Sequence, residues 1–127
     1  MSVFEDAALE APPDVEFVDL RTVAGRIWLP QLSEVLVAEG ITRLLVEGGP
    51  RIWQAMMEAR MVDEIVVYRA LSPGDGETTN EALPAARDQT FAQLRAMNPR
   101  IRLACHAMRK LDNDAELVFR RTLSTNL

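Results

Sequence analysis

The spacing of apolar residues alternates along the chain between the two-residue period of a strand and the 3.6-residue period of a helix. Apolar runs of strand length lie at residues 15–20 (VEFVDL), 41–47 (ITRLLVE) and 65–70 (IVVYRA). Helical spacing separates these runs at residues 29–39, before Gly40, and again from Pro50 to about Arg60. The pattern predicts a βαβαβ unit with parallel strands and helices covering the sheet.

The amino-acid composition changes after the third predicted strand. Residues 72–86 are rich in proline, glycine, aspartate and threonine, which predicts a loop. Residues 87–97 then have the spacing of a short helix, with Phe91 and Leu94 expected to face inward and Pro99 closing it.

The end of the chain predicts two further strands. Residues 101–108 alternate in the manner of a half-buried strand, and residues 115–122 form another apolar run. Residues 112–114 (DND) lie between them and have the composition of a turn. The predicted fold class is α/β, a mostly parallel mixed sheet with helices on its faces and a C-terminal antiparallel hairpin.

Composition indicates a folded domain. The chain has 127 residues, of which 48% are hydrophobic and 26% charged, so we expect a single domain over residues 1–127. Residues 1–14 are interpreted as a linker or the remnant of a preceding strand. The first ten residues lack the features of a signal peptide and no long apolar run follows, which predicts a cytoplasmic protein.

Charge and residue counts exclude several function classes. A net charge of −5 argues against a broad nucleic-acid or membrane surface, so any anionic ligand must be held locally. Cys105 is the one cysteine and His106 the one histidine, which rules out an internal disulfide and the common zinc sites. No metal is expected, and a Ser-His-Asp triad is disfavoured because His106 reads as a strand residue.

Candidate chemistry lies where the second predicted strand meets the second helix. Glu47, Gly48, Gly49 and Pro50 are followed by Arg51 at this junction, where open α/β sheets bind ligands. Glycines let the backbone approach an anion, and a helix N-terminus supplies N–H donors and partial positive charge. The alternative is a tight turn, in which the glycines only permit a positive φ and Glu47 is a solvated strand end.

Residues 42–70 (TRLLVEGGPRIWQAMMEARMVDEIVVYRA) carry a specific resemblance. A strand ending in VEGG, a helix, the step at residues 61–64 (MVDE) and another strand together resemble the reductase domain of the bacterial bifunctional riboflavin biosynthesis deaminase/reductase. That family has a dihydrofolate reductase-like fold. The likeness thins beyond Ala70, although the turn at residues 111–114 is similar to the family's closing hairpin. It covers the second half of the family's domain, so the chain is expected to be truncated.

The resemblance implies NADPH-dependent reduction of 5-amino-6-(5-phosphoribosylamino)uracil to the ribitylamino product. Gly48 and Gly49 match glycines that contact the cofactor pyrophosphate, with Arg51 and Ile52 following at the helix start. Glu47 matches the acid of the motif and is the candidate catalytic residue, placed near the nicotinamide and the substrate. The phosphoribosyl pyrimidine and NADPH are thus the expected ligands.

Other residues at matching positions favour structural roles. Asp63 and Glu64 fall in the matched step but read as a helix-to-strand turn. Trp53, Met56 and Met57 have the helical spacing of core residues rather than of a binding site.

The missing first half of the domain leaves alternatives open. Half a sheet has an unpaired edge, which predicts a homodimer or a partner chain that supplies the missing strands. The competing hypotheses are a non-catalytic dimerising module of the same fold and a reductase that acts on another substrate.

Overall fold

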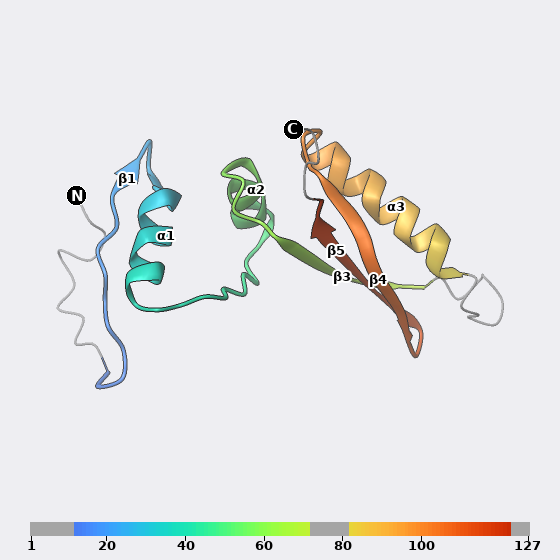
Figure 1. The fold of residues 1–127 in the computed structure, drawn as a ribbon, viewed down its shortest axis with the longest axis horizontal. Helices are drawn as coiled ribbons and strands as arrows, with labels where there is room; N and C mark the ends of the chain where they lie inside the picture. The colour runs from blue at the N-terminus through green and yellow to red at the C-terminus, as the bar shows by residue number, and fades with distance from the viewer. Residues whose placement is uncertain (1–11, 72–81, 123–127) are drawn as a thin grey trace. The chain divides into compact units, whose positions relative to one another are not determined.

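A computed structural model describes residues 12–71 and 82–122 of the chain (Figure 1). The chain divides into two compact units, Met1–Leu45 and Val46–Leu127. The prediction of one domain over residues 1–127 stays a prediction, and most of the predicted linker lies outside the described residues. No helix in the described ranges is long and apolar enough to span a membrane.

The first unit contains a small hairpin that the apolar pattern does not predict. Strands β1 (Thr22–Val23) and β2 (Arg26–Ile27) pair antiparallel. The two residues between them, Ala24 and Gly25, have φ values of 53° and 75°. Positive φ at both central positions belongs to the turns whose twist suits a two-residue hairpin.

Helix α1 (Leu29–Ala38) follows the hairpin and confirms the predicted helix at residues 29–39. Pro30 lies in the first turn, where its missing N–H costs no hydrogen bond. Glu39 caps the end, donating its N–H to Val35 O at 3.1 Å, and Gly40 follows at φ 78°. Gly40 therefore ends the helix as predicted, through a left-handed conformation that suits glycine.

The two predicted strands at residues 15–20 and 41–47 are wrong. Both segments run without strand pairing. Their apolar side chains are exposed, with 52% of Phe17 and 79% of Leu45 accessible. An apolar run becomes a strand only where another strand offers free backbone groups, and no such neighbour exists for these segments among the described residues.

The second unit holds the remaining elements. They are α2 (Pro50–Glu58), β3 (Glu64–Ala70), α3 (Ala82–Met97), β4 (Leu103–Leu111) and β5 (Asp114–Arg121). The helix from Pro50, the strand at 65–70 and the closing hairpin are thereby confirmed. The described strands of this unit form one sheet in the order β3-β5-β4.

The expectation of a mostly parallel sheet is wrong, because β5 pairs antiparallel with both neighbours. The strand that pairs with β3 is β5, not the strand predicted at residues 41–47. The fold is a mixture of helices and antiparallel strands rather than the expected parallel arrangement.

Helix α3 begins earlier than predicted. Residues 82–86 are helical although the composition predicted a loop through residue 86. Leu83 and Ala86 are buried at helical spacing, and Pro84 falls in the first turn, where proline is tolerated. Burial of these side chains outweighs the turn-like composition.

Helix α3 runs along the sheet of β3, β5 and β4 (Figure 1), and the hydrophobic core lies between this helix and one face of the sheet. Ala115, Leu117 and Phe119 alternate along β5 and are fully buried at 0% exposure. Phe91 of α3 stacks on Phe119 with ring centroids 6.1 Å apart. The opposite face of the sheet carries the exposed side chains of β3, including Tyr68.

Candidate functional site

The start of α2 is set by an unusual sequence of glycine and proline. Gly49 is the N-cap residue with φ −77° and ψ −176°, and Pro50 occupies the first turn. The Gly49 carbonyl accepts the N–H groups of Ile52 and Trp53 at 3.1 and 3.3 Å. No side chain caps the helix, so its N-terminal face is formed by backbone alone.

Gly48 is required by packing within the chain. A Cβ built on Gly48 would overlap the Ile52 side chain and lie 3.2 Å from its Cβ. Any larger residue at this position would require the Ile52 side chain to shift. The glycine thus lets the chain enter the helix at a close approach to Ile52, which is the sequence-predicted residue at the helix start.

Gly49 is different, because no packing contact with the described residues requires a glycine there. A Cβ on Gly49 would meet no atom within 4 Å, and its φ is open to any residue. Positive φ values among the described glycines occur at Gly25 and Gly40. The alternative in which the site glycines serve a positive φ is therefore wrong, and the space beside Gly49 is open.

The backbone around this space presents hydrogen-bond donors. The N–H groups of Gly48, Gly49 and Arg51 have no backbone acceptor within the described ranges. They lie at the positive end of the α2 dipole. The Arg51 side chain is exposed and has no ion-pair partner in the part of the chain that the structure describes. This set of donors suits an anion.

Glu47 precedes the glycines and is also exposed. Its carboxylate makes no hydrogen bond or ion pair with any other described residue, so both oxygens are available as acceptors. The expectation that Glu47 stands at the end of a strand is wrong, because residues 41–47 are unpaired. The structure still places Glu47, Gly48, Gly49, Arg51 and Ile52 together in one short segment.

Asp63 and Glu64 are structural, as the turn interpretation predicted. Asp63 contacts Arg121 at 3.4 Å, and Glu64 accepts from Arg120 Nε at 2.8 Å. These ion pairs join the start of β3 to the end of β5, away from the helix N-terminus in sequence. Both carboxylates are thus engaged in the sheet rather than offered to a ligand.

The prediction that Trp53, Met56 and Met57 are core residues of α2 is confirmed for the two methionines only. Met56 and Met57 are buried, with 5% and 6% of each accessible. Trp53 is 45% exposed, although its spacing predicted burial. It lies in the first half of α2, close to the candidate site in sequence.

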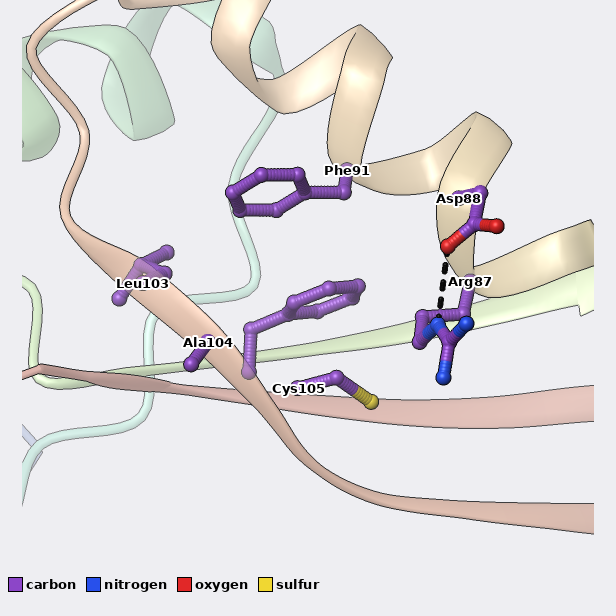
Figure 2. A pocket seen from close by; sticks show the side chains of 7 residues that line it. Arg87, Asp88, Phe91, Leu103, Ala104 and Cys105 are labelled. Carbon is purple, nitrogen blue, oxygen red and sulfur yellow. Dashed lines mark hydrogen bonds and ion pairs between the residues drawn. The ribbon is translucent and has the colours of Figure 1, made fainter. Parts of the chain in front are cut away.

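The lone cysteine lies away from this segment. Cys105 on β4 is half-buried and lines a shallow cavity with Phe91 and Phe119, beside the Arg87–Asp88 ion pair (Figure 2). The hydrogen bond from Arg87 to Asp88 raises the pKa of the guanidinium. Within residues 12–71 and 82–122, no three His, Cys, Asp or Glu side chains gather in a metal-binding arrangement.

A polar cluster on the open sheet face was missed by sequence reasoning. The Tyr68 hydroxyl donates to Glu116, which raises the tyrosine pKa and lowers that of the carboxyl. Arg109 contacts the same carboxylate at 3.1 Å. The cross-strand register could not be read from the sequence without knowing that β5 is central, and the cluster is structural in character.

Comparison with known proteins agrees with the resemblance found in the sequence. The family model described as RibD C-terminal domain matches residues 3–73, which include the whole segment from Glu47 to Ile52. The match ends close to Ala70, beyond which the likeness thins. The match confirms the resemblance to the C-terminal reductase domain of the bifunctional riboflavin biosynthesis deaminase/reductase. No curated protein matches the chain.

Proposed function

Because the family match covers more than half of its residues, the chain belongs to the RibD C-terminal domain family, and we propose that it is an NADPH-dependent reductase domain of riboflavin biosynthesis. The proposed substrate is 5-amino-6-(5-phosphoribosylamino)uracil, reduced to its ribitylamino product. Membership of this family supports an oxidoreductase of the reductase type. The substrate and the cofactor are proposed in addition.

The open space beside Gly49 carries the proposal. The φ of this glycine suits any residue and no described atom packs against it, and the N–H groups at the start of α2 have no side-chain cap. Glycine is a good N-cap residue, and a ligand that approaches the backbone closely would be a further reason for a glycine there.

The residues present fit the pyrophosphate of a dinucleotide. The N–H groups of Gly48, Gly49 and Arg51 would donate to its oxygens, and the exposed Arg51 guanidinium would neutralise charge. In an acidic chain of net charge −5, such local positive potential is what an anionic cofactor requires. When bound, NADPH supplies the hydride for the sugar carbon of the substrate.

Glu47 would act beside these backbone N–H groups. Its free carboxylate can accept hydrogen bonds from substrate hydroxyl or amino groups and so fix their orientation. Protonated, the same group could donate a proton to the substrate nitrogen as the hydride arrives. A Glu47→Gln variant would retain the first role in part and lose the second.

Isothermal titration of NADPH into the full chain tests the proposal, with Gly49→Val as the decisive variant. The valine side chain would fill the space beside the backbone donors, so we expect at least about a tenfold loss of affinity. The fold should survive, because a Cβ at residue 49 meets no atom within 4 Å.

Ala59→Val is the matched control, since it adds the same kind of bulk at the exposed C-cap of α2. NADPH affinity should be unchanged in this variant. Equal affinity of wild type and Gly49→Val for NADPH would contradict the cofactor assignment, and so would a complete lack of binding by the folded wild-type chain.

A non-catalytic module that binds a partner is the second candidate, favoured by the exposed apolar segments. Phe17, Leu44 and Leu45 are all more than half exposed. Exposed apolar side chains of this kind suit contact with a second copy or another chain. Light scattering on the titration sample separates the candidates: a dimer that binds no NADPH supports the module, and a dimer that binds NADPH supports the reductase.

A further inference from the structure

Arg69 on β3 is held in an unusual way. Its Nη1 donates to Thr90 Oγ1 at 3.3 Å and to Gln93 Oε1 at 3.1 Å, and its Nη2 donates to Gln89 Oε1 at 2.8 Å. All three acceptors are neutral side chains of α3. The guanidinium is therefore fixed in place while its charge is left uncompensated by a carboxylate in the described part of the chain.

The surroundings explain why these groups are ordered. Gln89 and Gln93 are one helical turn apart on an exposed face of α3, and Thr90 beside them is 3% accessible. The neighbouring carboxylate in sequence, Asp88, is engaged by Arg87 at 2.9 Å. The position of the arginine is thus set by the packing of α3 on the sheet rather than by an ion pair.

The orientation of both glutamine amides follows from this arrangement. Because each Oε1 accepts from Arg69, each Nε2 group has only donors to offer. Neither amide nitrogen makes a hydrogen bond with another described residue. The Nε–H and one Nη2–H of Arg69 likewise donate to no described residue.

From this surplus of donors we infer that Arg69, Gln89 and Gln93 form a second anion site, one that takes a small oxyanion such as a phosphoryl or carboxylate group. A guanidinium fork flanked by two amide donors offers several N–H groups and no acceptor, which favours an anion over water or a cation. The site is separate in sequence from the α2 N-terminus and does not depend on the proposed reductase activity.

The test follows inorganic phosphate and acetate by NMR on the labelled full chain, at constant ionic strength. The side-chain amide signals of Gln89 and Gln93 and the Arg69 Nε–H signal should shift and saturate with at least one of the two anions. The response to phosphate against acetate identifies which oxyanion geometry the site prefers.

Gln89→Glu is the decisive variant, because it offers Arg69 an internal carboxylate without removing the contact between β3 and α3. The affinity of the anion should fall by at least about tenfold while the fold is kept. Ala92→Glu, on the same helix and also exposed, is the matched control and should change affinity less than about twofold.

Three outcomes would overturn the inference. One is a wild-type chain in which neither anion shifts the three side-chain signals, which would leave the cluster a purely structural clamp. Another is an equal affinity in wild type and Gln89→Glu. The last is a response confined to the backbone amides of Gly48 and Gly49, which would assign all anion binding to α2.

Discussion

The two units of the chain differ most in what they bury. Every buried side chain among the described residues lies in the unit Val46–Leu127, and the described residues of Met1–Leu45 contribute none. Yet the family match covers residues 3–73, so it spans the described first unit and only the beginning of the second. The described part of the first unit thus lies wholly within the family match, although none of its side chains is buried.

This difference teaches what the apolar pattern means in each unit. In the second unit the pattern is satisfied by pairing, since β5 lies between two strands and α3 covers one face. In the first, apolar side chains such as Leu45 remain exposed, because no described strand pairs with residues 41–47. The second unit has its own core, whereas the described residues of the first unit have none.

Core truncation gives the largest expected effect. Phe119→Ala removes a fully buried ring that stacks on Phe91, and should lower the free energy of unfolding by about 3–5 kcal/mol. Leu45→Ala, at a side chain that is 79% exposed, should change it by less than about 0.5 kcal/mol. Urea denaturation followed by circular dichroism measures both.

A loss in the free energy of unfolding that is nearly as large for Leu45→Ala as for Phe119→Ala would contradict this difference between the units. Such a result would mean that residues 41–47 are buried in solution, in an assembly with another chain. Repeating the measurement at several protein concentrations separates that case, because stability that comes from association rises with concentration.

Glycine substitutions give a smaller effect that contrasts Gly40 with Gly49. Gly40→Ala places a side chain at φ 78° after α1 and should cost about 1 kcal/mol of stability. Gly49→Ala lies at φ −77° with open space around it, and because alanine is a poorer N-cap residue than glycine it should cost about 0.5 kcal/mol. Thermal unfolding of the two variants checks the contrast, and a larger loss at Gly49 would show that this position is structural.

The smallest effect concerns the pH dependence of the Tyr68–Glu116 pair. The folded pKa of Glu116 is lowered from 4.5, so its contribution is present above that pH and lost as pH falls through the folded value. The folded pKa of Tyr68 is raised from 10.0, so its contribution is present below that pH and lost on titration above it.

Glu116→Gln should therefore lower stability slightly relative to wild type between pH 4.5 and 10.0, with the difference shrinking outside that window. Tm measured across pH for both proteins is the readout. A difference that is constant over the whole range would show that the carboxylate charge contributes nothing to this cluster.

Local signals in the sequence predicted the elements, while pairing decided the sheet. Gly40 and Pro30 marked the ends of α1, and residues 112–114 marked the closing turn, because these residues act through their own backbone conformations. The parallel strands at 15–20 and 41–47 failed because strand formation depends on a neighbour elsewhere in the chain. Helix α3 began early because burial of Leu83 and Ala86 is a tertiary effect that composition does not reveal.

The candidate site was predictable as a segment but not in its detail. The order of Glu47, Gly48 and Gly49 before a helix could be read directly. That Gly48 is required by Ile52, whereas Gly49 faces open space, appears only with atomic positions. The Arg69 cluster was invisible in sequence because it joins residues 20 or more positions apart across the fold.

The central claim is that the backbone at the start of α2 holds the pyrophosphate of NADPH. Recording ¹⁵N spectra of the labelled chain during an NADPH titration tests it most directly. The account predicts saturable shifts of the Gly48, Gly49 and Arg51 amides, with Gly25 of the hairpin turn unmoved. A saturable response that leaves these three amides unchanged, or no response from a folded chain, would contradict it.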